Sequence, residues 1–171
     1  IAQGLSEQDL KLLSYLWRRG VTVIAVANKW DLVPDKSGDS AQDLETEFRR
    51  RSHETEEAPF ILISAKTGHK ISRLMDMVLE SHASAHQKIS TPVLNRRIHE
   101  WNGQMPSGLF RGNPGKLKYG VQTGQAPLTF KIFVNDPKTF RREALRYLRK
   151  RFREAFGLHG VPILLELVTD R

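Results

Sequence analysis

The feature that most constrains this chain is a continuous apolar run rich in β-branched residues, Val21–Ala27. Such a run is typical of a strand buried on both faces of a parallel sheet. A second apolar run, Pro59–Ile63, follows a charged segment over residues 41–52 that predicts a helix. Helical patterns also cover Ser6–Arg19, with Ser6 as cap, and residues 71–85. This alternation predicts right-handed crossovers and therefore parallel strands.

The amino-acid composition becomes mostly polar around Ser84–Thr91, and Pro92 follows. We therefore predict a first domain over residues 1–86, a linker over 87–91 and a second domain over 92–171. A chain of 171 residues is long enough for two small domains with separate cores.

The second domain has an α+β pattern. Pro92 suits the first turn of a helix that ends at Trp101, with Thr91 as its cap. A glycine-rich loop, two strands, a long helix and a final strand are predicted to follow, over residues 103–115, 116–122, 129–135, 138–156 and 161–168. The fold class is thus α/β, a parallel sheet with helices followed by a small α+β domain.

Charge also divides the chain. Residues 1–86 contain 11 Lys/Arg and 13 Asp/Glu. Residues 87–171 contain 16 Lys/Arg and only 6 Asp/Glu. The basic half suits a polyanionic partner, although a merely soluble basic surface would look the same. No apolar run approaches the roughly 20 residues of a membrane span. The chain has no cysteine, and its scattered histidines give no third metal ligand, so we expect a cytoplasmic protein without membrane contact or metal site.

Asn28-Lys29-Trp30-Asp31 directly follows the first predicted strand, where open α/β sheets bind their ligands. The Asp31 carboxylate can accept from both N1–H and the N2 amine of guanine. Adenine lacks this donor pair and would leave the carboxylate unpaired. Asn28 would bind the base edge and tie neighbouring loops together, and the Lys29 stem would cover one purine face. Taken alone, the motif also fits a polar turn.

Ser64-Ala65-Lys66 has the same place after the second predicted strand, so the two loops would lie side by side. The Ser64 hydroxyl would brace Asp31, and the Ala65 N–H would donate to guanine O6. Lys66 would cover the opposite face of the base. Together the two loops predict a guanine site made of Asn28, Lys29, Asp31, Ser64, Ala65 and Lys66.

NKWD and SAKTG resemble the fourth and fifth motifs of small GTPases, and AQGLSEQD resembles the segment after the third motif in the double-Era-like GTPases, Der or EngA. TPVLNRRIHEW, LKYGVQTG, PLTFKIFVNDP and RYLRKRFREAFGLHGVPILLEL are similar to that family's C-terminal KH-like domain. The resemblance covers essentially the whole chain. It implies the back of a second GTPase domain, with a partial P-loop-GTPase-type sheet, joined to a KH-like domain.

The same resemblance implies a role in assembly of the large ribosomal subunit. It implies GTP or GDP as ligand, and as partners rRNA and the upstream GTPase domain of the same protein. The sequence contains no G-x-x-x-x-G-K-[ST] motif and no switch threonine that can be assigned, elements that hold the phosphates, Mg²⁺ and attacking water. We therefore expect no catalytic residue here, Mg²⁺ only in the complete GTPase domain, no GTP hydrolysis by the isolated chain, and exposed apolar surface where the first strands of the sheet are missing.

Four arginines fall on one face of the predicted long helix: Arg142, Arg146, Arg149 and Arg153. This stripe suits contact with a phosphate backbone. It equally fits a solvated helix face, or an intramolecular contact with an acidic GTPase domain.

Two G-x-x-G matches, Gly112–Gly115 and Gly157–Gly160, each lie between a predicted helix and a predicted strand. An RNA-gripping KH fold places this motif between two helices, so both matches are predicted to be turns. We expect contact with folded rRNA through shape and charge. Two alternatives stay open: a non-catalytic ribosome-binding module that retains a GTPase remnant, and a relative of Era.

Overall fold

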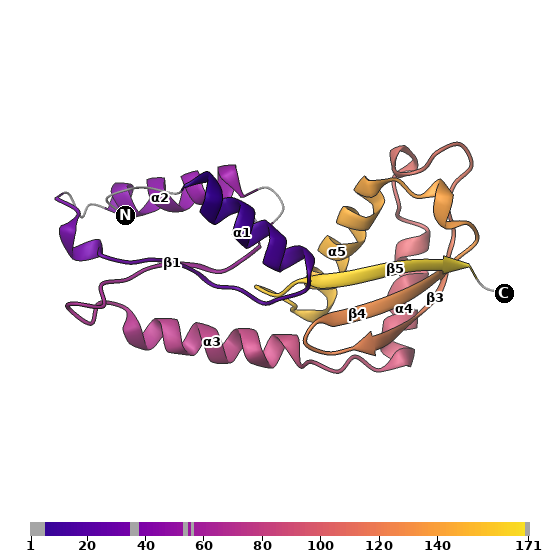
Figure 1. The fold of residues 1–171 in the computed structure, drawn as a ribbon. Helices are drawn as coiled ribbons and strands as arrows, with labels where there is room; N and C mark the ends of the chain where they lie inside the picture. The colour runs from indigo at the N-terminus through magenta and orange to yellow at the C-terminus, as the bar shows by residue number, and fades with distance from the viewer. Residues whose placement is uncertain (1–5, 35–37, 53–54, 56, 170–171) are drawn as a thin grey trace. The chain divides into compact units, whose positions relative to one another are not determined.

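The computed structural model describes residues 6–34, 38–52, 55 and 57–169. The chain divides into two compact units (Figure 1). The first unit is Ile1–Ser84 with Gly160–Pro162, and the second is Ala85–His159 with Ile163–Arg171. Over the described ranges, no helix has the length and apolar character needed to cross a bilayer.

The first unit begins with α1, Glu7–Arg18, and Ser6 is its N-cap as predicted. The Ser6 Oγ accepts the backbone N–H of Asp9 at 3.2 Å, and Asp9 Oδ2 accepts the N–H of Ser6 at 3.2 Å. This reciprocal pair satisfies two backbone donors that the first helical turn leaves open. Hydrogen bonds from Ser6 lower the pKa of the Asp9 carboxyl, so the carboxylate stays charged at the positive end of the helix.

Two strands form the sheet of this unit, β1 (Ala25–Ala27) and β2 (Phe60–Leu62). They pair in parallel, with Ala25 opposite Phe60 and Ala27 opposite Leu62, so the predicted parallel sheet is confirmed. The connection contains the 3₁₀ turn η1, Trp30–Leu32, and the helix α2, Gly38–Arg51. β1 is shorter than predicted because β2 offers only three partners.

Figure 1 shows α1 and α2 on one side of the strand pair and α3, Ile71–Ala85, on the other. The core under α1 and α2 contains Trp17, Phe48 and Ala58. The Phe48 ring stacks on Phe60 of β2 with centroids 4.8 Å apart, which fixes α2 against the sheet.

The free edge of β1 has apolar character. The strand was predicted to be buried on both faces, but Val26 is 41% exposed, so that prediction is wrong for this residue. Among the described strands β1 pairs with β2 alone, and an open groove of about 670 Å³ lies between α1, β1 and α2. Leu12 and Val21 are also exposed, which agrees with the apolar surface expected here.

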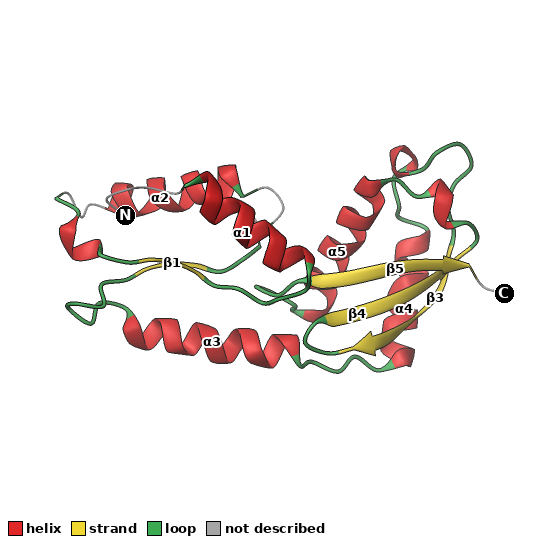
Figure 2. Cartoon of the chain, in the orientation of Figure 1, coloured by secondary structure: helices red, strands yellow, loops and turns green. Residues whose placement is uncertain are grey.

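The second unit has the predicted α+β order (Figure 2). Its elements are α4 (Thr91–Asn102), β3 (Leu117–Gly124), β4 (Leu128–Val134), α5 (Arg142–Phe156) and β5 (Ile163–Thr169), with short 3₁₀ turns η2 (Ser107–Leu109) and η3 (Pro137–Thr139). The sheet order is β3-β4-β5, antiparallel between β3 and β4 and parallel between β4 and β5. The N-cap of α4 is Ser90 and not Thr91, because helical geometry begins one residue earlier than predicted.

The core of this unit lies where α4 and α5 pack on one face of the sheet. Alternate residues of β4 are buried, as a strand with one covered face requires. The Phe152 ring of α5 lies 4.7 Å from Phe130 of β4 and 5.1 Å from Trp101 of α4. This aromatic cluster joins both helices to the sheet.

The segment between α3 and α4 is hydrogen bonded to the second unit. The Gln122 side chain accepts the backbone N–H of Ile89 at 2.8 Å and donates to the Gln87 carbonyl at 2.9 Å. Gln87 in turn donates to the carbonyl of Phe156 at 3.1 Å. The placement of a linker at residues 87–91 stays a prediction.

Gly120 of β3 lies close to α4 and to the neighbouring strand β4. A Cβ built there would lie 2.5 Å from Ile98 Cδ1 and 2.8 Å from Ile132 Cδ1. We predict that Gly120→Ala lowers the free energy of unfolding by about 1–3 kcal/mol, the usual cost of overpacking a core. Denaturant unfolding tests this, with Gly108→Ala as control because its Cβ would meet open space. Equal stability of the two variants would contradict the packing described here.

Candidate functional site

The two predicted loops lie at the same edge of the first unit's sheet. β1 ends at Ala27 and β2 at Leu62, and these residues are partners in the parallel ladder. The N–H of Ile63 donates to the Ala27 carbonyl at 2.9 Å, and the N–H of Trp30 donates to the Ile63 carbonyl at 3.0 Å. The backbone therefore brings the turn after β1 against the turn after β2.

The predicted contact between Ser64 and Asp31 is confirmed. The Ser64 hydroxyl donates to Asp31 Oδ1 at 2.6 Å, and Ser64 is only 1% exposed. Ser64 Oγ also accepts the backbone N–H of Thr67 at 3.2 Å, which fixes the hydroxyl in place. A buried hydroxyl thus orients a half-buried carboxylate, and hydrogen bonds to a charged group are among the stronger ones in proteins.

Asn28 ties the two turns together, as predicted. Its Oδ1 accepts the backbone N–H of Lys29 at 2.7 Å and that of Ala65, across the gap between the turns, at 3.0 Å. The Ala65 N–H was expected to donate to a guanine O6. In this structure it donates to Asn28, and the contact with a base stays a prediction.

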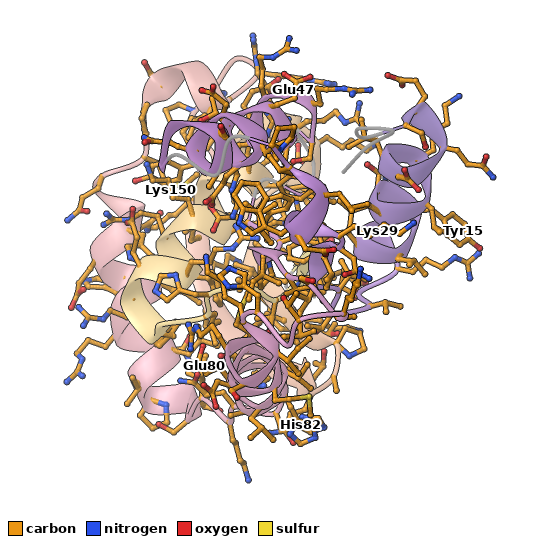
Figure 3. The ribbon with its side chains drawn as sticks, turned by 90° about the vertical axis from the view of Figure 1, so that its left-hand side faces the viewer. Tyr15, Lys29, Glu47, Glu80, His82 and Lys150 are labelled. Carbon is orange, nitrogen blue, oxygen red and sulfur yellow. The ribbon has the colours of Figure 1, made fainter. Side chains whose placement is uncertain are left out.

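Lys29 and Lys66 are both exposed, one in each turn (Figure 3 labels Lys29). Lys29 has a φ of 69°, a left-handed conformation that costs a non-glycine residue of order 1–3 kcal/mol. The next residue, Trp30, is buried, and its backbone N–H donates to the Ile63 carbonyl at 3.0 Å, which fixes the turn beside Lys29. The motif spacing gave Trp30 no role, although a large aromatic residue inside a polar turn is a signal for a buried anchor.

The turn after β2 is closed by a short bridge between Ser64 and His69. Gly68 has a φ of 78°, which glycine adopts without steric cost, so the chain can reverse direction there. The part of the chain that the structure describes has no group of three acidic, histidine or cysteine side chains that could hold a metal ion.

In the second unit the arginine stripe of α5 is split. Arg142 and Arg146 are exposed, whereas Arg149 and Arg153 are half-buried. The Arg149 Nε donates to the Ile163 carbonyl of β5 at 3.0 Å. Burial, with the charges of Arg153 and Arg146, lowers the pKa of the Arg149 guanidinium. Arg149 therefore has a structural contact that the helical spacing did not indicate.

Both G-x-x-G matches lie between a helix and a strand, as predicted. Gly157 is the C-cap of α5 with a φ of 65°, a common way for a helix to end. Gly115 lies against the rings of Phe110 and Phe140, so the first match packs on the protein itself.

Comparison with known proteins agrees with these two units. A family model of the KH-domain-like C-terminal region of EngA bacterial GTPase enzymes matches residues 88–167. A model of the elongation factor Tu GTP-binding domain matches residues 1–84. GTPase Der of Rippkaea orientalis is 35% identical over 165 residues, and GTPase Der of Limosilactobacillus fermentum is 35% identical over 163 residues; each match covers 95% of this chain. This chain belongs to the Der (EngA) GTPase family.

The chain spans 36% and 37% of the length of these two Der proteins. Among solved structures, Era of Aquifex aeolicus bound to GDP·AlF₄⁻ is 17% identical with a TM-score of 0.40, over 98% of this chain and 62% of that one.

The contact between Asn28 and Ala65 in this Der-family chain can be tested without any ligand. We predict that Asn28→Ala increases amide hydrogen exchange at Ala65 by up to about tenfold, because a hydrogen bond contributes about 0.5–1.5 kcal/mol. NMR exchange rates measure this directly. Asn28→Asp keeps an acceptor oxygen at the same place and should preserve the protection. Unchanged exchange in Asn28→Ala would show that the side chain does not join the turns.

Proposed function

We propose that this chain supplies the guanine-recognition part and the RNA-contacting part of a cytoplasmic GTPase that acts in assembly of the large ribosomal subunit. The observation that supports nucleotide binding most strongly is the pair of cross-linked turns at the carboxyl ends of β1 and β2. Family membership adds to this support, because the relatives are named as GTPases.

In the proposed site Asp31 recognises the base. The Ser64 hydroxyl holds Oδ1, so the carboxylate is oriented before a ligand arrives. A fixed carboxylate accepts N1–H and the N2 amine of guanine together, and it would meet no such donors on adenine. Discrimination through such hydrogen bonds is stronger than through shape, because the wrong base leaves a polar group unpaired.

Asn28, Lys29 and Lys66 complete the proposed site. Because Asn28 Oδ1 accepts two backbone N–H groups, a contact with an acceptor on the base edge would come from Nδ2. The exposed lysine stems would lie over the two faces of the ring, where their methylene groups can cover an aromatic surface.

Phosphate binding and hydrolysis are assigned to the remainder of the GTPase domain. The motif that cradles the phosphates and positions Mg²⁺ in GTPases does not occur in these 171 residues. We therefore propose GTP hydrolysis as a property of the complete protein, with the present residues providing base selectivity.

The second unit is proposed to contact rRNA, or the neighbouring GTPase domain, through the four α5 arginines. Arg142 and Arg146 are exposed and suited to phosphates. Arg149 and Arg153 are half-buried, and they would add positive charge to the same helix face. The excess of basic residues after position 87 favours a polyanion over an uncharged partner.

The guanine assignment predicts a change of base preference. In the complete protein, Asp31→Asn should weaken GDP binding by about tenfold to a hundredfold, since hydrogen bonds to charged groups contribute about 1.5–3 kcal/mol. It should also improve binding of xanthosine diphosphate, whose C2 oxygen can accept from the new amide. Competition with a fluorescent guanine nucleotide measures both. Asp43→Asn, on the exposed side of α2, is the matched control. If guanine selectivity is unchanged in Asp31→Asn, Asp31 does not read the base.

The RNA assignment predicts a salt-dependent loss of association. The double variant Arg142→Glu/Arg146→Glu should sediment less with large ribosomal subunits, and its binding should depend less on salt because fewer counterions are released. Lys88→Glu/Arg96→Glu makes the same charge change at exposed residues elsewhere in the unit. Wild-type sedimentation of the α5 variant would mean that this helix face has another role.

A further inference from the structure

Two loops at one end of the second unit are joined into a single surface. One runs from α4 to β3 over residues 103–116, and the other runs from β4 to α5 over residues 135–141. The N–H of Arg111 donates to the Thr139 carbonyl at 2.7 Å, and the N–H of Arg141 donates to the Leu109 carbonyl at 3.0 Å. Loops far apart in sequence are thereby paired like strands.

The pairing is rigidified by side chains. Phe110 and Phe140 are buried and pack edge to face with centroids 5.3 Å apart. A Cβ at Gly115 would lie 2.5 Å from the Phe140 ring, so this glycine allows the first loop to pass close to the aromatic pair. The Asn135 side chain accepts the N–H of Lys116 at 2.7 Å, and the N–H of Asn135 donates to the Lys116 carbonyl at 3.1 Å.

This paired surface, called the loop platform below, presents five exposed cations: Arg111, Lys116, Lys138, Arg141 and Arg142. Within residues 103–142 the sequence has one acidic residue, Asp136. Its carboxylate accepts the backbone N–H of Lys138 at 2.9 Å and so serves the turn. The loop platform is therefore strongly positive.

The cations of the loop platform differ in their contacts from several basic residues of the same unit. Three basic side chains elsewhere in the unit have acidic partners: Arg97 with Glu100 at 2.9 Å, Lys131 with Glu166 at 3.6 Å and Lys150 with Glu154 at 4.0 Å. The side chains of Arg111, Lys116, Lys138 and Arg142 have no ion pair or hydrogen bond with any residue that the structure describes. Their charges are thus presented to solvent.

Fold stability does not explain this arrangement. Arg141 and Arg142 are the N-cap and first residue of α5, where the helix dipole disfavours positive charge. Glu143 is the only acidic residue in the first turn of α5 that offsets this positive charge. A site that concentrates like charges against local electrostatics is expected to bind a ligand that neutralises them.

The residues of the loop platform favour a duplex nucleic acid over a protein, a membrane or a single strand. Among the described residues, the exposed large apolar side chains lie outside residues 103–142, so the platform has no anchor of the kind that protein interfaces and membrane-bound surfaces use. Its two phenylalanine rings are buried and cannot stack on splayed bases, as single-strand binders require. Cations that project from a well-packed loop backbone, with no exposed large apolar or aromatic side chain beside them, suit the phosphates of a regular duplex.

We propose that the loop platform binds the phosphodiester backbone of double-stranded RNA. This inference rests on the proposed RNA contact of the second unit, and it adds a surface that shares only Arg142 with the α5 arginines. Binding is independent of base sequence, because the lysine and arginine contacts reach phosphates and not base edges.

The test uses the 171-residue chain and a fluorescein-labelled RNA hairpin with a long duplex stem. In the variant Arg111→Gln/Lys116→Gln/Lys138→Gln, affinity should fall by about tenfold or more. The slope of log K against log salt should become shallower by about 0.7–0.9 for each lost contact, a total near two. The melting temperature should not fall, because these side chains have no described partners to lose.

Two controls separate position from charge. Lys88→Gln/Arg96→Gln/Lys150→Gln removes the same charge at exposed residues elsewhere (Lys150 is labelled in Figure 3) and should change affinity by less than about threefold, since exposed charges beyond a Debye length are screened. The charge-preserving variant Arg111→Lys/Lys116→Arg/Lys138→Arg should bind like wild type, even if the glutamine variant proves less stable.

Several outcomes would overturn the inference. Equal losses in the platform and control variants would mean that net charge alone drives binding. Equal affinity for polyglutamate or for a single-stranded RNA of the same length would refute the assignment to a duplex. If the platform variant binds like wild type while Arg146→Glu, which lies outside the platform, binds more weakly, the platform fails and the proposed α5 contact stands. If the wild-type chain binds no RNA, both proposals fall together.

Discussion

The parallel pairing of β1 with β2 is the interaction on which the candidate site depends. A parallel ladder places both carboxyl ends at one edge, so turns separated by more than thirty residues of chain meet there. The hydrogen bond from Ser64 to Asp31 and the one from Ala65 to Asn28 then need only local adjustment. Phe48 and Phe60 stack beneath α2 and hold the crossover against the strands. Without this pairing, each motif would be an ordinary polar turn.

In the second unit, too, a pairing between segments that are far apart in sequence positions charged side chains. A pairing between segments that are remote in sequence, Phe110 with Phe140, fixes where α5 begins and which way its first residues face. The two rings take up the space between the loops, and backbone hydrogen bonds on either side keep the loops in register. Positive side chains in mobile loops would lose much entropy on binding a polyanion. Here the pairing of the loops holds the backbone that carries these side chains, so less backbone entropy is lost on binding.

The two units therefore divide the chemistry of a Der-family chain. The first offers a fixed carboxylate, suited to the donor edge of a purine, with exposed lysine stems beside it. The second offers unpaired positive charge on a rigid support. The guanine recognition proposed for the first unit would depend on hydrogen-bond geometry, whereas the RNA contact proposed for the second would depend on counterion release.

The order of helices and strands, the Ser6 cap and the two turns that carry polar side chains could be predicted from the sequence, because these follow from local periodicity and turn chemistry. The sequence also placed Ser64 near Asp31, since two parallel strands leave little choice. Three features follow from tertiary contacts alone: the length of β1, the burial of Arg149, and the start of α5 at Arg142, whereas the helix was predicted from residue 138. Each of these depends on a partner far away in the chain: three residues of β2, a carbonyl of β5, and a phenylalanine in another loop. Spacing along one helix or strand cannot report such partners.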